Sequence, residues 1–511
     1  MVGFGFSWTD SSVEVINRLT PELQDQVMRE LFSQEGNNMG IMRHTIGSSD
    51  LSGRQYSFDD NGPSFNEGEP DLELQNFDIG EDGRAMVELI ARMGKYKSDV
   101  FLIGAPWSYP GWMKHNGLFV APNLNPEVGG SYMIMNNSFD AQYIPQAARY
   151  FEKYLDAYKD HGVSINALSL QNEPLNYQGG TTAMYLDPAD AAAILNHGLG
   201  ALLNDRNIAL FAYDHNTDQT AYPMVMIQRA PKYVDAAAWH CYAYLANYSV
   251  MDDFYYAYPD KPQFMTECSS YLPKTGSIDW QVANAFMPSI QHGGSGANMW
   301  VLATDPDYGP HSPYGGCAGC QGAVIVNSSS SYMRTNNYYM VGQFSRFIRR
   351  GSTAYNIVKG NEGSHLSPNQ FNTFAAQNLD DSWAIVFVNN MNRTENVRLS
   401  FTGSDSVWEG VVPNATVTTW ILPCDNVMRG DRAANATSPA SYPFANGTSP
   451  WNGPTGTGRA SNEICKLPPV TTAASSSASS SSTPLVPVPN QGHVVEQNVL
   501  GLETNRENRY C

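Results

Sequence analysis

Short apolar runs alternate with amphipathic, helix-like segments over about the first 350 residues of this 511-residue chain. Eight runs have the character of strands, and most neighbouring pairs are separated by one amphipathic segment. Strands that alternate with helices form parallel sheets, and eight such units close into a (β/α)8 barrel. The sequence therefore predicts an α/β protein with a TIM barrel, and a doubly wound open sheet is the alternative. The eight runs are GFGFSW, MGIMRHTIG, DVFLIGAPWS, INALSLQNEP, IALFAYDHN, DAAAWHCY, QFMTECS and GANMWVLATD.

Two of the amphipathic segments carry clear helix signals. In residues 145–162, apolar and aromatic side chains fall on one face at helical spacing, and Gly162 stands where a C-terminal cap is expected. Asp187 and Pro188 open a second segment as N-cap and first helical residue. Helices of this kind fit the outer layer of a barrel. The apolar face of the first helix consists of Ala147, Phe151, Tyr154, Leu155 and Tyr158.

The pattern changes after Gly351, where short β-type runs with polar turns replace the alternation. We predict three parts: a barrel domain over residues 1–350, a smaller β-sandwich side domain over 351–423, and a tail over 424–511. The tail is rich in Ser, Pro, Gly and Asn, a low-complexity composition that cannot bury a core and therefore predicts disorder. The last stretch before Cys511 carries no signal that we can interpret.

The chain is strongly acidic, with 30 Lys and Arg against 49 Asp and Glu and a formal net charge of −19. Such a chain repels phosphate, so we expect neither nucleic acid nor anionic membranes as partners. It contains no uninterrupted run of about 18 apolar residues, so we expect no transmembrane helix and no membrane insertion. We expect a monomer.

The seven cysteines leave at least one thiol unpaired within the chain. Cys317 and Cys320 form a lone CxxC, which we interpret as a short structural disulfide. A zinc site would be expected to show a second CxxC, and a redox dithiol a thioredoxin-like context, although the spacing permits both. Cys424 and Cys465 flank a stretch rich in Gly, Asn, Ser and Pro and could also pair.

Seven N-x-S/T sequons, together with the expected disulfide, favour a secreted eukaryotic glycoprotein. The chain nevertheless starts MVGFGFSWTD, which has neither the basic nor the long apolar segment of a signal peptide. We therefore expect that the true N-terminus lies upstream of Met1. The sequons begin at Asn136, Asn247, Asn327, Asn392, Asn414, Asn435 and Asn446.

Polar side chains gather at the C-terminal ends of the predicted strands, the face at which barrel enzymes carry their active sites. Glu173 stands near the end of the fourth run and Glu267 near the end of the seventh. Cleavage of a glycosidic bond requires two facing carboxyl groups, one to protonate the leaving oxygen and one to attack the anomeric carbon. In a retaining enzyme they are about 5–5.5 Å apart, a distance that only the fold can set. Glu173 and Glu267 are therefore the candidate catalytic pair.

Other groups at the same rim fit that chemistry. Arg43 could hold Glu267 ionised, and Tyr242 could hydrogen-bond to it. Asn172 could bond the 2-hydroxyl of the sugar, a contact that strengthens in the transition state. Three tryptophans offer flat apolar faces for sugar rings: Trp107, Trp239 and Trp300.

The histidines do not indicate a metal centre. His44, His215 and His240 lie on three different predicted strands, without HxH or HExxH spacing, so hydrogen-bonding or core roles are the better interpretation. The GGSG at residues 293–296 lacks the lysine and the spacing of a phosphate-binding loop. We expect no metal and no cofactor, and we count His240 among the substrate-binding residues because it ends the sixth strand at the rim.

These residues stand in segments that, in this order, resemble glycoside hydrolase family 30, a member of clan A, over about residues 3–422. The segments are GFGFSWTD, MRHTIGSSDLS, APWSYPGWMK, LQNEP, MTECS and MWVLATDPDYGPH. The resemblance implies a (β/α)8 barrel with a side β-sandwich and a retaining mechanism, with Glu173 as acid/base and Glu267 as nucleophile. It also implies substrate-binding roles for Arg43, Asp50, Trp107, Asn172, Tyr242 and Trp300.

Two further segments, SPYGGCAGCQGAVIVN and YYMVGQFSRFIRRGS, resemble the fungal endo-β-1,6-glucanase branch, which implies a β-1,6-linked glucan as substrate. A glucosylceramidase-like or xylan-directed enzyme is the alternative within the family, and a sugar-binding protein without turnover is the alternative outside it. An apolar rim would favour the lipid, and an arginine placed for a glucuronate would favour xylan. The family usually begins with sandwich strands, whereas this chain starts at the first barrel strand, so we expect an incomplete side domain.

Overall fold

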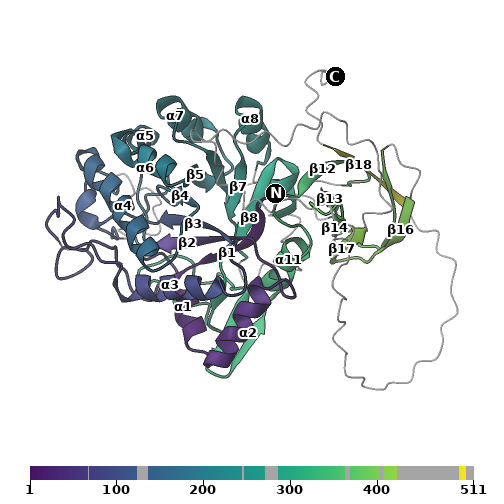
Figure 1. Ribbon diagram of the computed structural model, residues 1–511, viewed down its shortest axis with the longest axis horizontal. Coiled ribbons are helices and arrows are strands. Elements are labelled where there is room, and N and C mark those ends of the chain that lie inside the picture. Colours follow the sequence, from purple (N-terminus) through teal and green to yellow (C-terminus); the bar gives the residue numbers. More distant parts are fainter. Residues whose placement is uncertain are drawn as a thin grey trace.

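The computed structural model describes residues 1–66, 68–122, 136–243, 247–270, 286–362, 369–402, 407–422 and 494–501. Eight strands close into a parallel barrel in the order β1 to β8 (Figure 1). The predicted fold class is thereby confirmed, and the open-sheet alternative is wrong. The barrel strands are β1 (Gly3–Trp8), β2 (Ile41–Ile46), β3 (Phe101–Pro106), β4 (Ala167–Ser169), β5 (Ala209–Asn216), β6 (Ala236–His240), β7 (Gln263–Glu267) and β8 (Gly294–Met299).

Helices surround the barrel, and the two helices that the sequence marked most clearly are present. The predicted apolar face of α4 is buried, and Gly162 beyond its C-terminal end has a φ of 82°. The Asp187 side chain caps α5 by accepting a hydrogen bond from the Ala189 N–H at 2.8 Å. The α-helices are α1 (Asp10–Asn17), α2 (Pro21–Phe32), α3 (Gly80–Met93), α4 (Ile144–Asp160), α5 (Pro188–Ile194), α6 (Gly200–Asp205), α7 (Ala221–Arg229), α8 (Ser249–Ala257), α10 (Met287–Gln291) and α11 (Asn336–Ser345).

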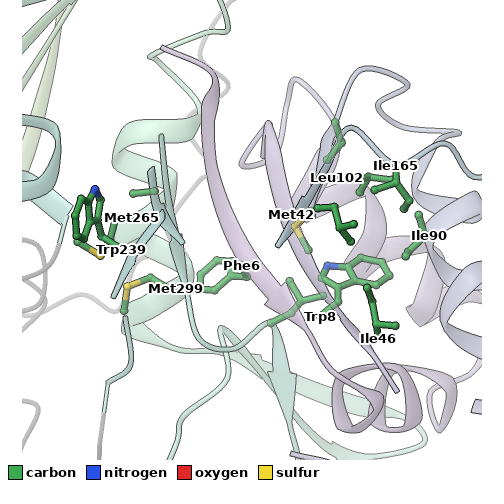
Figure 2. Close-up of a cluster of buried hydrophobic side chains, with 14 of the residues drawn as sticks. Phe6, Trp8, Met42, Ile46, Ile90, Leu102, Ile165, Trp239, Met265 and Met299 are labelled. Carbon is green, nitrogen blue, oxygen red and sulfur yellow. The ribbon is translucent and has the colours of Figure 1, made fainter. Parts of the chain in front are cut away.

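Successive side chains of each barrel strand point alternately toward the barrel axis and toward the helices. In β3, Phe101 and Ile103 belong to the inner cluster, whereas Leu102 packs in the outer layer between barrel and helices (Figure 2). Aromatic rings fill the inner cluster, where Phe211 and Phe264 stack with ring centroids 4.7 Å apart. Since the barrel is packed shut below its rim, a substrate can approach the strands only from their ends.

The same alternation corrects one prediction about a tryptophan. In β6, Ala236 and Ala238 belong to the inner cluster, so the next inward position is His240 and Trp239 points outward. Trp239 has no exposed surface, and its ring meets that of Phe254 on α8 edge to face at 5.9 Å. The suggestion that Trp239 offers a face for sugar rings is therefore wrong.

Two predicted strands end earlier than their apolar runs. β4 covers only Ala167–Ser169, and Glu173 has a left-handed φ of 47°, which an extended ladder cannot include. β8 ends at Met299, because the following residues bend away into a separate three-stranded sheet. That sheet consists of β9 (Ala303–Thr304), β10 (Val324–Ser328) and β11 (Ser331–Arg334).

Residues beyond the barrel form a seven-stranded sheet in the order β16-β15-β18-β12-β13-β14-β17 (Figure 1). Its two halves face each other as in a sandwich, since Phe401 of β15 packs edge to face on Trp383 of β14 at 4.6 Å. The other face of β14 joins the barrel cluster through Ala384 and Val386. The strands are β12 (Thr353–Lys359), β13 (Phe371–Gln377), β14 (Trp383–Asn389), β15 (Glu395–Phe401), β16 (Val407–Val412), β17 (Thr416–Leu422) and β18 (Val494–Gly501).

The strand β18 departs from the predicted tail. It pairs in parallel with β15 and antiparallel with β12, and so joins two groups of strands that would otherwise be separate sheets. The predicted disorder of residues 424–511 is wrong for Val494–Gly501. The segment VVEQNVLG was missed because a strand that completes an existing sheet needs little apolar pattern of its own. The other tail predictions, including a Cys424–Cys465 pair, lie outside the described residues, and the three domain boundaries stay predictions.

Candidate active site

A cleft with a volume of about 690 Å³ opens at the C-terminal ends of the barrel strands. Both candidate catalytic glutamates line it, one after β4 and one at the end of β7. Most of the predicted substrate-binding residues line it as well, since each follows a strand end closely: Asp50, Trp107, Asn172, Tyr242 and Trp300. The rings of Trp107 and Trp300 lie with centroids 5.1 Å apart, so the two tryptophans form one apolar surface.

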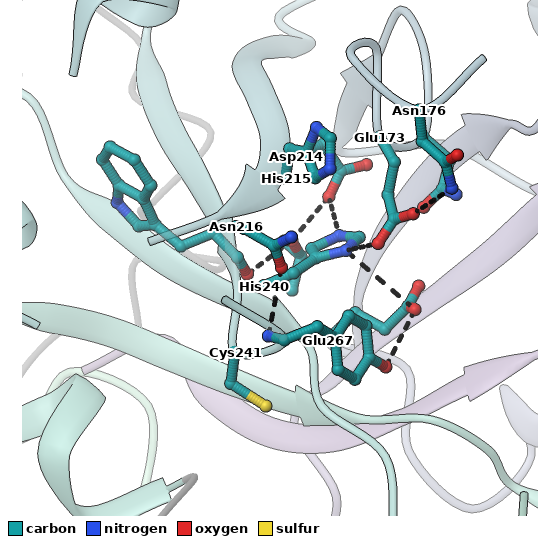
Figure 3. A network of polar contacts seen from close by, with 12 residues as sticks. Glu173, Asn176, Asp214, His215, Asn216, His240, Cys241 and Glu267 are labelled. Carbon is teal, nitrogen blue, oxygen red and sulfur yellow. Dashed lines mark hydrogen bonds and ion pairs between the residues drawn. The ribbon is translucent and has the colours of Figure 1, made fainter. Parts of the chain in front are cut away.

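The two glutamates face each other across the cleft (Figure 3). A carboxylate oxygen of Glu173 lies within 4.8 Å of one of Glu267. Their side chains are 15% and 8% exposed, so both reach the cleft although most of their surface is covered. The left-handed turn at Glu173 is held by its N–H, which donates to the Asp214 carbonyl at 2.9 Å. A rigid backbone at this position fixes the distance between the two carboxylates.

Arg43 lies beneath the cleft and connects several groups of the site. Its Nη1 donates to Glu267 Oε2 at 2.7 Å, and its Nη2 donates to Asn172 Oδ1 at 2.6 Å and to Asp214 Oδ2 at 2.8 Å. The guanidinium lies 4.7 Å from the ring centroid of Trp107. Arg43 was predicted to bind the substrate. It has no exposed surface, so it orients Glu267 and Asn172 and does not contact a substrate directly.

Tyr242 and Glu267 lie in the relation that the sequence suggested. The Tyr242 hydroxyl donates to Glu267 Oε1 at 3.0 Å. With Arg43 on Oε2, both oxygens of the Glu267 carboxylate are held, so its plane is fixed with respect to the cleft.

His240 also lies under the cleft, with no exposed surface. Its Nδ1 is 3.1 Å from Glu173 Oε1, and its Nε2 is 3.1 Å from Asp214 Oδ1 (Figure 3). Both ring nitrogens are therefore engaged with carboxylates. The prediction of a direct substrate contact by His240 is wrong for this geometry. The inward and outward alternation along β6 points the His240 ring toward the carboxylates below the cleft.

Asp214 is the central residue of this cluster, and it is not among the predicted site residues. It is fully buried, and its carboxylate accepts from Arg43 at 2.8 Å and from the Thr266 hydroxyl at 2.5 Å, besides its contact with His240. A bulge in β5, where Tyr213 and Asp214 have φ values of 81° and 54°, turns this side chain inward. The sequence does contain a signal for Asp214, because it lies in the polar end YDHN of the fifth run. Of these four residues, only the histidine was weighed as a site residue.

The charges of this cluster shift the pKa values of its members. Burial would raise the pKa of Glu173, but the hydrogen bond and the charge of His240 outweigh it and lower this pKa to about 2. Burial would lower the pKa of His240, but the carboxylates of Glu267, Asp214 and Glu173 raise it to about 9. Burial and the charges of Glu173 and Asp214 together raise the pKa of Glu267 above its ordinary value, and the opposing charges of His240 and Arg43 do not offset them. At neutral pH the Glu173–His240 pair therefore holds one proton, on the histidine.

One group in the described part of the chain could hold a metal ion, and it includes both candidate catalytic glutamates. Glu173, His240 and Glu267 each offer one ligand atom, all within 4.8 Å of one another. A metal at this place would have to displace the proton and the Glu173 contact from His240 Nδ1. The geometry thus fits a proton-sharing pair better than a metal centre. The other two histidines lie elsewhere: His44 bonds the Tyr154 hydroxyl at 2.8 Å, and His215 lines the cleft.

Two disulfides border the site. The predicted Cys317–Cys320 bond is confirmed, and both sulfur-bearing residues line the cleft. A second bond, Cys241–Cys268, joins the residue after His240 to the residue after Glu267. The sequence could not reveal it, because Cys241 and Cys268 are 27 positions apart and meet only when β6 and β7 pair.

Two carboxylates this close, one just after the fourth strand and one at the end of the seventh strand of a parallel barrel, are the arrangement of a glycoside hydrolase. The model of the glycosyl hydrolase family 30 TIM-barrel domain matches residues 1–348. The chain belongs to glycosyl hydrolase family 30, as the sequence motifs suggested.

Curated relatives extend the similarity beyond the barrel. The chain is 37% identical to the endo-1,6-β-D-glucanase of Neurospora crassa over 428 residues, which are 82% of this chain and 85% of that protein. It is 36% identical to the endo-1,6-β-D-glucanase of Aspergillus fumigatus over 429 residues, 83% of this chain and 85% of that one. A putative glucosylceramidase of Caenorhabditis elegans is 29% identical over 387 residues, 70% of this chain and 69% of that protein.

Solved structures share the fold at lower identity. A structure of an endo-β-1,6-glucanase superposes with a TM-score of 0.69 and 24% identity, over 82% of this chain and 91% of that one. The catalytic domain of a family 30 xylanase from Talaromyces cellulolyticus superposes with a TM-score of 0.57 and 19% identity, over 82% and 96%. These likenesses bear on the fold alone.

Proposed function

We propose that this protein is a retaining endo-β-1,6-glucanase in which Glu267 is the nucleophile and Glu173 the acid/base. The carboxylate pair carries the proposal: its oxygens lie within 4.8 Å, which fits the short spacing of a retaining pair. The linkage and the endo action follow from the two fungal relatives, each 36–37% identical over more than four-fifths of this chain. A cleft of about 690 Å³ supports the same proposal, because it is larger than a single sugar ring needs.

In the first step, Glu267 attacks the anomeric carbon while the bond from that carbon to the leaving oxygen breaks. The single proton of the pair passes from His240 Nδ1 to Glu173 across their 3.1 Å contact, and Glu173 gives it to the leaving oxygen, which leaves Glu173 ionised and His240 neutral. The product is a glucosyl ester of Glu267, and the negative charge of Glu267 disappears. Arg43 and Tyr242, which hold the two oxygens of Glu267, keep the attacking carboxylate aimed.

In the second step, Glu173 takes a proton from a water molecule, and the water oxygen attacks the anomeric carbon. The ester bond to Glu267 breaks, and the sugar leaves with its original β configuration. A low pKa suits Glu173 in this step, because a base must be ionised before it accepts a proton. The Glu173–His240 pair thus ends the cycle with the single proton that it held at the start.

The lining of the cleft supports a neutral polysaccharide as substrate. None of the described residues that line it is an arginine or a lysine, so the charged contact expected for a glucuronate on xylan is missing among them. Its only aliphatic side chain larger than alanine is Leu175, again among the described residues, which is little apolar surface for a lipid. Amide and hydroxyl groups beside paired tryptophans suit the hydroxyls and the apolar faces of glucose.

Secretion and glycosylation are part of the proposal. The five sequon asparagines in the described residues are all exposed: Asn136, Asn247, Asn327, Asn392 and Asn414. Two disulfides in one chain fit an oxidising compartment. No helix in the described part of the chain combines the length and the apolar character needed to cross a bilayer.

The purified protein is expected to depolymerise the linear β-1,6-glucan pustulan to oligosaccharides before glucose accumulates, with the β-anomer formed first. Hydrolysis of β-1,3-glucan, xylan and glucosylceramide should be at least about a hundredfold slower in kcat/KM, because wrong linkages leave hydroxyls and site groups unpaired. Product chromatography and anomeric NMR measure both. Faster hydrolysis of xylan or of glucosylceramide would contradict the proposed β-1,6 specificity. Binding of pustulan without hydrolysis would show a sugar-binding protein without turnover.

Asp214→Asn should move the alkaline limb of the kcat/KM profile to lower pH by about 1–3 units. Asp214 raises the pKa of His240, so its loss lowers the pH at which the Glu173–His240 pair gives up its proton. The limb position does not depend on how much of the variant folds. Asp218→Asn, which removes a carboxylate that bonds Tyr213 instead of His240, should leave the limb in place. If the alkaline limb of Asp214→Asn does not move, His240 does not supply the proton to Glu173.

A further inference from the structure

One wall of the cleft is the loop between β9 and β10, and it is fixed to the rest of the site. The N–H of Ser312 donates to the Asp50 carbonyl at 2.7 Å, and the N–H of Cys317 donates to the Asp50 carboxylate at 3.0 Å. The Cys317–Cys320 disulfide closes the far end of this loop. The wall is therefore tied to a residue that itself lines the cleft.

Two glycines let the wall approach its neighbours closely. A Cβ on Gly316 would lie 2.3 Å from Cβ of Asp50, and one on Gly315 would lie 2.1 Å from the carbonyl oxygen of Gly180. Both glycines have positive φ, 142° at Gly315 and 109° at Gly316. Larger residues would push the wall away, so the wall sits at a position set by direct backbone contact.

Tyr314 presents an aromatic ring from this wall. It lines the cleft and is 50% exposed, whereas the tryptophans of the cleft floor are almost covered. Its ring lies edge to face with Phe65, with centroids 5.7 Å apart, and Phe65 in turn meets the buried Phe119 at 6.3 Å. The ring is thus supported from one side and accessible from the other. An exposed aromatic ring on a supported loop inside a sugar cleft is suited to stacking on a sugar face.

The position of Tyr314 indicates which part of the substrate it meets. The leaving sugar must lie beside Glu173, where Asn176, which follows β4, and His215 and Asn216, which end β5, line the cleft. The reacting ring then lies toward Trp300 and the Asp50 loop on the other side of the pair. Tyr314 lies between Ser312 and Cys317, which both donate to Asp50, so its ring lies on the Asp50 side of the cleft, away from Asn216 and the leaving group.

We propose that Tyr314 is the stacking platform for the glucosyl ring next to the reacting ring on its non-reducing side. The inference rests on the proposed β-1,6-glucanase activity. Binding is strongest when a glucosyl ring covers Tyr314, and this favours cleavage of bonds inside the glucan chain. When the reacting ring is the non-reducing end of the chain, no ring covers Tyr314. Tyr314 is thereby a specificity residue for endo action.

The test uses a β-1,6-linked glucotetraose labelled at its reducing end, whose products report which bond was cut. In the wild type, internal bonds should be preferred over the bond that releases glucose from the non-reducing end. In Tyr314→Ala, the ratio of internal to terminal cleavage should fall about tenfold, which is the loss expected from uncovering one sugar face. Tyr314→Phe should keep the wild-type ratio. Because both products come from one substrate, the ratio is independent of the folded fraction.

Tyr256→Ala, which removes a 69% exposed tyrosine from α8 outside the cleft, is the matched control and should leave the ratio unchanged. An unchanged ratio in Tyr314→Ala would overturn the inference, and so would a shift toward internal bonds, which would place the ring on the leaving-group side. A wild type that cuts no bond of the tetraose and no pustulan would contradict the proposed function instead. The two failures are therefore distinguishable.

Discussion

Glu267→Gln should reduce kcat on pustulan by about 10⁴-fold or more, the scale seen when a catalytic nucleophile is removed. An amide cannot form the glucosyl ester, yet glutamine has nearly the size of glutamate and its oxygen can still accept from Tyr242 or Arg43. Substrate affinity should therefore change little. Initial rates and isothermal titration with β-1,6-oligosaccharides measure the two quantities separately.

A small nucleophile provides a sharper test of the same role. In Glu267→Gly, azide can enter the space left by the side chain and attack from the same face, so the expected product is the α-glycosyl azide. Glu152→Gln, which changes a half-exposed glutamate on α4, should keep the wild-type kcat. Glu267→Gln with more than a few per cent of wild-type turnover would be incompatible with Glu267 as the nucleophile.

Glu173→Ala should lower kcat/KM on pustulan by about 10³-fold, within the range that general acid–base catalysis contributes. The effect should depend on the leaving group. Glucose leaves as a poor anion and needs the proton of Glu173, whereas dinitrophenolate leaves without one. On a dinitrophenyl β-gentiobioside the first step should therefore stay close to the wild-type rate, and the glycosyl-enzyme should accumulate because no base activates water. Burst kinetics and mass spectrometry of the intact protein detect that accumulation.

Azide separates the two roles of Glu173. It needs no base to attack, so it should restore turnover of the activated substrate in Glu173→Ala and yield the β-glycosyl azide. Asn176→Ala, which removes an amide that donates to Glu173 Oε2 at 2.8 Å, leaves the carboxyl in place and should cause a much smaller loss. An equal loss on pustulan and on the activated substrate would assign Glu173 to positioning or folding and not to proton transfer.

The barrel and its candidate catalytic pair were predictable because both depend on local patterns in the sequence. Eight apolar runs separated by amphipathic segments leave few alternatives to a closed parallel sheet, and strand ends in such a sheet share one face. Glu173 and Glu267 stand near the ends of their runs, so both were identified without the structure. Trp239 shows how the same reasoning fails. A position near the rim does not tell whether a side chain points into the barrel or toward the helices, and this is known only once the inward residues of β6 are known.

Other features depend on contacts between distant parts of the chain. Asp214 turns inward only because β5 bulges, and the bulge has no clear sequence signal. The strand β18 has a partner on each side and was invisible beside a low-complexity segment. The Tyr314 wall depends on glycine contacts with the Asp50 and Gly180 loops, which are 130 or more positions away along the chain.

The sequence by itself determined the fold class, the family and the residue types available for catalysis, because periodicity and motif order are properties of the chain. The tertiary structure decided the distance between Glu173 and Glu267 and the placement of His240 between Glu173 and Asp214. It also decided which aromatic rings reach the cleft. Distances, burial and charge coupling arise only when strands far apart in sequence meet, and these quantities set the pKa values and the subsites.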